Sequence, residues 1–400
     1  MNEQVLTRPR PLLQPAASLL AHKLRRLRCG SLELTFANGA RESIRGAEPG
    51  PRANLHIQNP VALIARFAAK NDIGFAEGYF AGDWHTDNLF ALLELLARNE
   101  SALSSASGGL LGPLQRLRHQ ARRNSRRGSR RNIQAHYDLG NDFYGLWLDE
   151  TWSYSSARYA HPGEDLAHAQ RRKYRQHLDA LDARPGEHIL EIGCGWGGLA
   201  LEAAQRGLRV TGITLSPAQL EHATRRVREA GLDHLIELKL LDYRDLDGQY
   251  DHVVSIEMFE AVGEAYWPGY FDTVARVLRP GGRASLQVIT IDHDYFEHYR
   301  SGTDFIQRYV FPGGMLPSKQ VFAAATTAAG LNTRFADAFG GDYARTLVEW
   351  SRKVALQQDS LNALGYDQRF LRLWQYYLAY CHAGFVTARI DVVQAVLTHA

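Results

Sequence analysis

The chain has 400 residues, 45% of them hydrophobic, and this size predicts a globular protein with two domains, or one large domain and a smaller companion. Its formal net charge of +3 is only mildly basic, so the distribution of charge is more informative than the sum. The cysteines Cys29, Cys194 and Cys381 are too scattered for a zinc site or a disulfide framework. This excludes zinc-finger and disulfide-rich proteins and favours a reducing compartment.

Hydrophobic residues are spread along the chain and form no uninterrupted run long enough to span a bilayer. The N-terminus carries Glu3 and Arg8 to Arg10 and lacks the apolar core and cleavage site of a secretory signal. We therefore expect a cytoplasmic protein with no metal site.

The first part of the chain predicts a small α+β domain over residues 1–105. Residues 1–28 suit an amphipathic helix that caps the domain or touches a membrane surface, and capping is favoured. Asn38-Gly39 predicts a turn after a strand that begins near Ser31. The next expected features are a strand, a helix, a stretch rich in glycine and aromatic residues, and a second helix, at residues 53–58, 60–70, 74–84 and 89–97.

Arginine dominates the following segment, residues 106–133, which we interpret as a linker. Eight arginines lie between Arg116 and Arg131. Three interpretations stay open: a solvated run of charge, attraction to anionic lipid headgroups, and attraction to nucleic-acid phosphates.

Aromatic and acidic residues crowd the segment 134–157, immediately before the expected core of the second domain. We expect this segment to lie across the mouth of the ligand site of that domain, although packing in the core would explain its aromatic residues equally well.

A glycine-rich loop follows a short apolar strand at residues 188–192 and leads into a helix at 199–205. Its glycines are Gly193, Gly195, Gly197 and Gly198. Glycines at such a turn let the backbone approach a ligand closely, and the helix start offers unpaired N–H groups. The acidic residue precedes the glycines and the G-x-G-x-x-G order is missing, so the loop resembles motif I of S-adenosylmethionine (SAM) methyltransferases.

Further strands and helices alternate after the loop. We expect strands at residues 209–214, 235–240, 251–257 and 284–289, the last one after a turn at Arg279-Pro280-Gly281-Gly282. Ser216 is expected to cap a helix that starts at Pro217, with Gln219 closing a capping box. This alternation predicts an α/β fold, a doubly wound SAM-methyltransferase (Rossmann-like) sheet over residues 134–400, beside the smaller N-terminal α+β domain.

Six ordered motifs resemble the cyclopropane fatty acyl phospholipid synthases. They are QAHYDLGNDFY, YSSA, LEIGCGWGGLA, SIEMFEAVG, FIQRYVFPGGMLPS and GDYARTLVEW. The G-x-x-E-G-Y-x-x-G-x-W run that begins at Gly74 resembles the N-terminal domain of the same family. The resemblance implies a SAM-dependent enzyme that bridges the double bond of an unsaturated acyl chain in a membrane phospholipid with a methylene group, with a lipid-associated N-terminal domain and acyl-binding insertions in the second domain.

The resemblance also implies which residues contact SAM. These positions are Tyr154, Ser155, Gly193, Gly195, Thr214, Gln219, Tyr243 and Arg244. Tyr154 and Ser155 are expected to reach the methionine carboxylate, and the stretch Asp242-Tyr243-Arg244 to lie near the adenine.

A bicarbonate ion that acts as the base is implied in the same way, and its site falls on Ser156, Glu260, Gln287, Ile289 and Tyr343. The chain departs from the family where serine replaces the usual cysteine at 156 and glutamine replaces the usual histidine at 287. Both residues still offer hydrogen-bond donors for an anion, but Gln287 cannot take up a proton.

Cyclopropanation is the predicted reaction, in a dry acyl tunnel that excludes water. Aromatic rings of residues 134–154, with Tyr309 and Phe311, are expected to stabilise the cationic chain or to line the pocket, and Tyr295 to Ser318 to cover the chain. The alternative is C-methylation giving methyl-branched or methylene products. A more remote alternative is a catalytically silent lipid-binding protein.

The expected partners are an unsaturated phospholipid and the anionic inner face of the membrane, with which the protein would associate peripherally. No nucleic-acid partner is expected, because the fourth strand ends in Glu257-Met258-Phe259-Glu260 and not in the Asn/Asp-Pro-Pro-aromatic run of amine methyltransferases. A homodimer is implied by the family resemblance alone.

Overall fold

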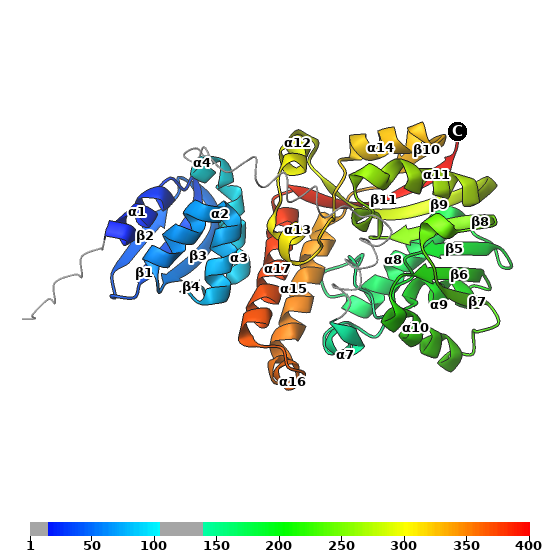
Figure 1. Ribbon diagram of the computed structural model, residues 1–400, viewed down its shortest axis with the longest axis horizontal. Helices are drawn as coiled ribbons and strands as arrows, with labels where there is room; N and C mark the ends of the chain where they lie inside the picture. Colours follow the sequence, from blue (N-terminus) through cyan, green and yellow to red (C-terminus); the bar gives the residue numbers. More distant parts are fainter. Residues whose placement is uncertain (1–14, 105–138) are drawn as a thin grey trace, which may run out of the picture. The chain divides into compact units, whose positions relative to one another are not determined.

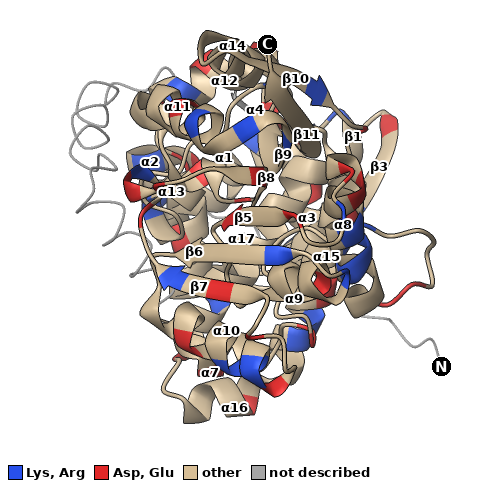
Figure 2. Cartoon of the chain, turned by 90° about the vertical axis from the view of Figure 1, so that its right-hand side faces the viewer, with Lys and Arg blue, Asp and Glu red and all other residues tan. Residues whose placement is uncertain are grey.

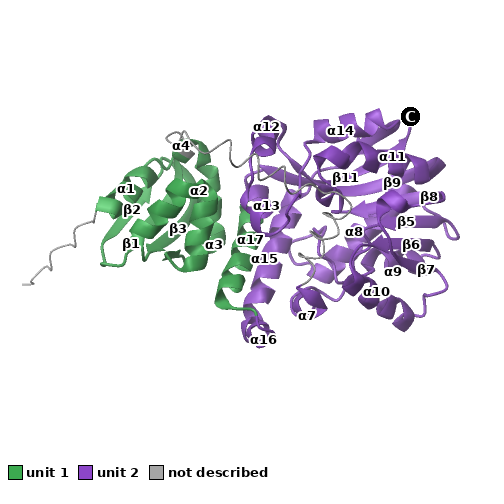
Figure 3. Ribbon diagram, in the orientation of Figure 1, with its two compact units in different colours: residues 1–110, 366–383 green, residues 111–365, 384–400 purple. Residues whose placement is uncertain are grey.

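The computed structural model describes residues 15–104 and 139–400 (Figure 1). The chain divides into two compact units (Figure 3): residues 1–110 with 366–383, and residues 111–365 with 384–400. Residues 366–383 therefore belong to the first unit, although the sequence places them after most of the second. The predicted linker, residues 106–133, lies outside the described residues, and so do residues 1–14 of the predicted N-terminal helix.

The first unit contains a four-stranded sheet with the order β2-β1-β3-β4, in which β1 pairs with β3 in parallel and with β2 antiparallel. Its strands are β1 (Cys29–Phe36), β2 (Arg41–Arg45), β3 (Glu48–Ile57) and β4 (Trp84–His85). Its helices are α1 (Pro15–Leu24), α2 (Pro60–Ala81), α3 (Leu89–Arg98), α4 (Glu100–Ser104) and most of α17 (Gln368–Val386). The described part of the unit is an α+β structure, as the sequence predicts.

The second unit is organised around a seven-stranded sheet with the order β10-β11-β9-β8-β5-β6-β7 (Figure 1). Five neighbouring strands are parallel, and β11 joins β9 antiparallel. The strands are β5 (His188–Ile192), β6 (Arg209–Thr214), β7 (Ile236–Leu240), β8 (Tyr250–Ile256), β9 (Leu278–Ile291), β10 (Leu331–Phe335) and β11 (Ile390–His399). The strand order reverses direction between β5 and β8, which is the point where ligands bind in sheets of this kind.

Helices cover both faces of this sheet. One buried core packs α8 (Leu166–Leu181), α9 (Gly198–Gln205) and α10 (Pro217–Glu229) against it, and a second core packs α11 (Trp267–Val277) and α14 (Lys319–Ala328) on the sheet. The other helices are α7 (Gly140–Gly145), α12 (His293–Ser301), α13 (Phe305–Tyr309), α15 (Gly340–Leu356) and α16 (Gln358–Ala363). The doubly wound α/β fold predicted from the sequence is confirmed.

The predicted strands at 188–192 and 209–214 are confirmed residue for residue, because each is a short apolar run buried between helices. Two local predictions are wrong, and a third is incomplete. Arg279 to Gly282 do not separate two elements but form a bulge inside β9, where Tyr250 pairs with Leu278 and His252 with Arg283.

The helix predicted at 60–70 continues, with a kink at Asn71, through the glycine-rich stretch to Ala81. Its Gly78 packs so closely that an added Cβ would lie 3.1 Å from Leu63 Cδ1. Gln219 does not close a capping box, since its Oε1 accepts a hydrogen bond from Thr214 Oγ1 (2.9 Å), whereas Ser216 does cap α10.

Within the described residues no helix is both long and apolar enough to cross a bilayer. The same residues contain no cluster of three or more His, Cys, Asp or Glu that could hold a metal ion.

Candidate active site

The glycine loop and the acidic segment Glu257–Glu260 lie side by side at the carboxyl ends of β5 and β8. These strands pair directly, so the residues that follow them meet at the point where the strand order reverses. A Cβ added at Gly193 would lie 2.8 Å from Met258 Cγ, which shows how closely the two segments approach. The fold therefore brings the predicted cofactor loop next to Glu260, one of the residues of the predicted base site.

The loop itself fits a ligand that approaches the backbone. Gly193, Gly195 and Gly197 have φ values of +87°, +51° and +81°, a region in which other residues are strained. A Cβ added at Gly195 would meet nothing within 4 Å, so there is space in front of this glycine. Helix α9 begins at Gly198, and its N-cap residue Gly197 makes no side-chain capping bond. These features suit the predicted SAM.

The other predicted SAM contacts take part in local hydrogen bonds. Thr214 Oγ1 donates to Gln219 Oε1, and Arg244 forms a two-pronged ion pair with Asp242 (2.8 and 2.6 Å) beside the ring of Tyr243. Thr214 is the last residue of β6, and the other three predicted contacts follow β6 or β7, at the same edge of the sheet as the glycine loop. Their role in binding stays a prediction.

Tyr154 and Ser155 lie between α7 and α8. The Tyr154 ring packs against Tyr144 and Trp350, with ring centroids 5.3 Å apart in both pairs. Ser155 Oγ accepts a hydrogen bond from Lys173 Nζ (2.6 Å). Ser155 is thus fixed by a buried cation, a contact that the sequence did not reveal.

Asn141, in helix α7, ties the segment before the core to the cofactor loop. Its Oδ1 accepts a hydrogen bond from Trp196 Nε1 (2.8 Å), and its Nδ2 donates to the carbonyl oxygen of Ala218 (3.0 Å). Trp196 belongs to the glycine loop and Ala218 to the first turn of α10. One amide therefore holds α7 against two elements that border the cofactor site, which agrees with the predicted position of this segment.

Glu257 carries the carboxylate at which most of the predicted base site converges. Its Oε1 accepts hydrogen bonds from the Ser156 backbone N–H (2.8 Å) and from Gln287 Nε2 (2.7 Å). Its Oε2 accepts one from the Tyr343 hydroxyl (2.6 Å). The side chain retains accessible surface, although burial raises its pKa and the three donors counteract that rise.

Glu260, the carboxylate that the sequence analysis singled out, stands apart from these donors. Its Oε1 accepts a hydrogen bond from Ile289 N–H (2.6 Å), and its buried Oε2 has no partner among the described residues. Burial, together with the charge of Glu257, raises the pKa of Glu260 to about 8. The predicted five-residue set is therefore split: Ser156, Gln287 and Tyr343 surround Glu257, while Ile289 holds a Glu260 that is mostly protonated at neutral pH.

Helix α8 forms a polar wall behind this site. Lys173 and His177, one turn apart, are both fully buried. Burial lowers the pKa of Lys173 to about 8 and that of His177 to about 3. His177 Nδ1 lies 2.7 Å from Ser285 Oγ, and its Nε2 lies 3.4 Å from Gln287 Oε1.

A second glutamine helps His177 to fix the Gln287 amide. Gln394 Nε2 donates to Gln287 Oε1 (3.3 Å), so the oxygen of Gln287 is occupied and its nitrogen faces Glu257. Sequence reasoning missed Glu257, Lys173 and His177. A second acid three residues before Glu260 and the Lys-x-x-x-His spacing on one helix face were the available signals.

Known proteins resemble this chain over most of its length. The family described as mycolic acid cyclopropane synthetase matches residues 124–395. The tuberculostearic acid methyltransferase UfaA1 of Mycobacterium tuberculosis is 41% identical, over 96% of this chain and 92% of its own length. The cyclopropane-fatty-acyl-phospholipid synthase of Escherichia coli is 31% identical, over 89% of this chain and 90% of that protein.

Among solved structures, mycolic acid cyclopropane synthase CmaA1 complexed with SAH and CTAB aligns with a TM-score of 0.63 and 31% identity. The alignment covers 67% of this chain and 97% of CmaA1. The likeness to an SAH complex supports SAM as the cofactor of the glycine loop.

Replacing Asn141 with alanine should weaken SAM binding, because the hydrogen bonds to Trp196 and Ala218 would no longer hold α7 across the cofactor site. Loss of about 1.4 kcal/mol, a typical value for such bonds, corresponds to a tenfold higher dissociation constant by calorimetry. Asn332→Ala, an exposed asparagine of β10, is the control. Equal affinities in both variants would contradict the assigned role of Asn141.

Removing the hydroxyl of Tyr343 should move the pH dependence of the reaction. The Tyr343 hydrogen bond lowers the pKa of Glu257, so Tyr343→Phe raises that pKa further, and the carboxylate becomes deprotonated only at higher pH. We expect the acid limb of the kcat profile to shift upward by about one pH unit. Tyr250→Phe, at the opposite end of β8, should leave the profile in place, and an unmoved limb in Tyr343→Phe would exclude Glu257 as the titrating base.

Proposed function

Because the chain belongs to the mycolic acid cyclopropane synthetase family of SAM-dependent enzymes, we propose that it methylates the double bond of an unsaturated phospholipid acyl chain and uses Glu257 as the base. The product that we propose is a C-methylated chain and not a cyclopropane. The hydrogen bonds that converge on Glu257 support the choice of base, and the relatives support the choice of product.

The carboxylate of Glu257 accounts for the base without a bound bicarbonate. A planar carboxylate with two oxygens offers the same hydrogen-bonding edge as bicarbonate. It engages Ser156, Gln287 and Tyr343, three of the five residues that the family resemblance assigns to the anion. A side chain anchored to β8 would then replace a diffusible ion. Of the two departures from the family pattern, Gln287 donates to this side chain with its amide, and Ser156 with its main chain.

Ser156 holds Glu257 through its main chain, since its hydroxyl donates to the Ala157 carbonyl oxygen (2.9 Å). In this arrangement Gln287 does not have to take up or release a proton, because its amide only donates a hydrogen bond to the proposed base. The lost imidazole at position 287 is therefore compatible with catalysis.

When bound, SAM supplies an electrophilic methyl group, to which the alkene gives its π electrons, so that a positive charge remains on the acyl chain. The carboxylate of Glu257 then takes one proton from the methylated chain, and the electrons of the broken C–H bond cancel that charge. Gly193, Gly195, Thr214 and Gln219, with Tyr243 and Arg244, are the residues that would hold the cofactor. Tyr343 and Gln287 keep the base in position throughout.

Aromatic rings beside the base are suited to the cationic chain. The Tyr343 ring stacks on Phe385, with centroids 4.5 Å apart, and lies edge-on to Trp350 at 6.2 Å. Trp350 in turn contacts Tyr154 at 5.3 Å. A ring face near a desolvated cation contributes about 2 kcal/mol, and such rings also exclude water.

The choice of product depends on where the electrons of that C–H bond go. If they close a three-membered ring, the product is a cyclopropane, and if they form a double bond, it is a methylene-branched or rearranged alkene. The relative that is 41% identical over both units is named a methyltransferase, which supports the branched product. The synthase from Escherichia coli, at 31% identity over a similar length, supports cyclopropanation as the second candidate.

The product can be identified by incubating the purified protein with SAM and vesicles of a monounsaturated phosphatidylcholine. We expect an acyl chain heavier by one CH₂ that retains a double bond and takes up hydrogen on mild catalytic hydrogenation. Trideuteromethyl SAM distinguishes the source of the lost proton, since three retained deuterons mean that it left the chain and two that it left the new methyl. A saturated product with ring protons in the NMR spectrum would contradict C-methylation.

Replacing Glu257 should abolish turnover and leave SAM binding intact, and Glu257→Gln should lower kcat about 100-fold or more. Glu257 has φ +50°, so Glu257→Gly also relieves the backbone and leaves the space of the carboxylate empty.

Added bicarbonate should therefore restore activity to the Glu257→Gly protein but not to Glu257→Gln, whose amide still fills the space. Stimulation of the unmodified protein by bicarbonate, in buffer depleted of carbon dioxide, would refute a built-in base.

A further inference from the structure

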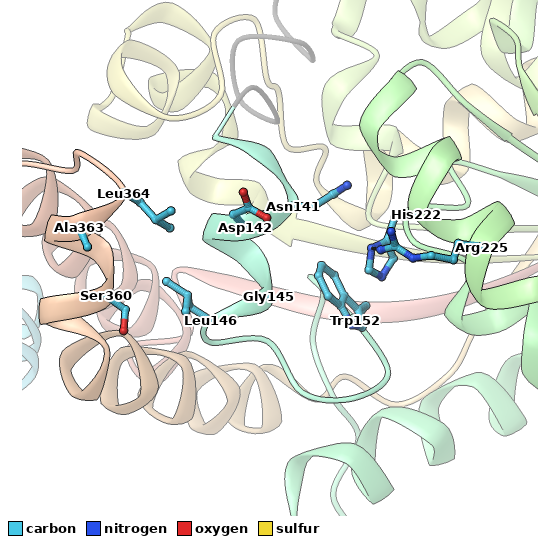
Figure 4. Close-up of a pocket in the computed structure, with 10 residues that line it drawn as sticks. All are labelled: Asn141, Asp142, Gly145, Leu146, Trp152, His222, Arg225, Ser360, Ala363 and Leu364. Carbon is cyan, nitrogen blue, oxygen red and sulfur yellow. Dashed lines mark hydrogen bonds between the residues drawn. The ribbon is translucent and has the colours of Figure 1, made fainter. Parts of the chain in front are cut away.

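An open pocket of about 630 Å³ lies between α7, α10 and α16 of the second unit (Figure 4). Its wall includes Asp142 of α7, Trp152, the α10 residues His222 and Arg225, and Leu364 just after α16. Asn141, which holds α7 against the glycine loop, also lines the pocket, so the pocket borders the cofactor site, but these other lining residues take no part in the active site described above.

Opposite charges stand on different walls of this pocket. Asp142 and Arg225 are both exposed and come from α7 and α10, and in Figure 4 the indole of Trp152 lies between these helices. Arg225 Nη2 donates to His222 Nδ1 (2.8 Å), so the ring proton of His222 sits on Nε2. His222 is only 7% exposed, and that Nε2 has no hydrogen-bond partner in the described part of the chain. The pocket thus presents a cation, an anion and a buried donor.

Trp152, which lines the pocket, has a strained backbone conformation. Its φ of +57° is unusual for a large side chain, and strain of this kind gathers at binding sites. The indole lies 3.8 Å from the His222 ring, centroid to centroid. Gly145 makes room for it, because an added Cβ there would lie 2.9 Å from Trp152 Cη2. The strained backbone places an aromatic ring between the helices that carry Asp142 and Arg225.

One exposed apolar side chain, Leu364, lines the pocket and is 46% exposed. Two more, Leu356 (70%) and Val348 (42%), lie on α15, the helix that precedes α16. Leu240 is the other large exposed hydrophobic residue among the described residues of this unit. Basic residues line the neighbouring helix α10 (Figure 2). Leucines beside a pocket with fixed charges form an amphiphilic surface, which matches the polar and apolar layers of a lipid interface.

We propose that this pocket binds the headgroup of a zwitterionic phospholipid at a membrane surface, with the phosphate on Arg225 and the ammonium group between Asp142 and Trp152. The leucines at positions 356 and 364 enter the interfacial layer of the bilayer. The assignment rests on the proposed function, because it names the class of lipid that delivers the acyl chain. Guanidinium–phosphate and cation–π contacts are the expected recognition chemistry.

The test compares binding of the full chain to vesicles of dioleoyl phosphatidylcholine and of dioleoyl phosphatidylglycerol, which lacks the ammonium group. Arg225→Gln should weaken binding to both about tenfold, as expected for one charge-assisted contact. Asp142→Asn should weaken binding to phosphatidylcholine alone. Arg228→Gln, an exposed arginine of the same helix outside the pocket lining, is the matched control.

The apolar rim is tested by Leu364→Ser against Leu240→Ser, because both leucines are 46% exposed. Only Leu364→Ser should reduce vesicle binding, and in turnover it should raise KM and leave kcat unchanged. Unaltered vesicle binding by Arg225→Gln and Leu364→Ser would overturn the proposal, whatever product the enzyme forms. Normal vesicle binding by the unmodified protein without any methylated lipid would refute the proposed function instead and leave the headgroup site standing.

Discussion

A carboxylate placed inside a protein must be matched by donors, and the end of β8 is built around this constraint. Glu257 has a positive φ, and its carboxylate accepts hydrogen bonds from Ser156, Gln287 and Tyr343. Each donor comes from a different part of the second unit: the segment before α8, the middle of β9 and the first turn of α15. The position of one charge thus ties together elements that are up to 187 residues apart in sequence, from Ser156 to Tyr343.

The hydrogen bonds of Glu257 explain why this carboxylate, and not its neighbours, is our proposed base. Burial raises the pKa of all three buried carboxyls, Glu191, Glu257 and Glu260. At Glu257 the hydrogen bonds of its three donors, and after them the charge of Lys173, counteract that rise, whereas the charge of Glu257 raises the pKa of Glu260 further. The charge of the buried Lys173 favours ionisation of both Glu257 and Glu191, and uncompensated buried charges are costly. Lys173 also donates a hydrogen bond to Ser155, one of the predicted cofactor contacts.

The sequence was sufficient for features that depend on local pattern. Apolar runs predicted β5 and β6 to the residue, and the glycine order identified the cofactor loop. It could not tell Glu257 from Glu260, because only the left-handed turn at Glu257 decides which of two acids three residues apart meets Tyr343. The extension of α2 was missed for a similar reason, since glycines that usually end helices here allow close packing against Leu63 and Trp84. The polar wall of α8 depends on contacts with β9 that no local pattern encodes.

Glu257 is the centre of this account, and a crystal structure of the full chain with S-adenosylhomocysteine, grown in the presence of bicarbonate, tests it most directly. The account predicts electron density in which the Glu257 carboxylate itself contacts the Tyr343 hydroxyl, the Gln287 amide and the Ser156 N–H. A separate planar anion bound to these three groups, with Glu257 turned away, would contradict it.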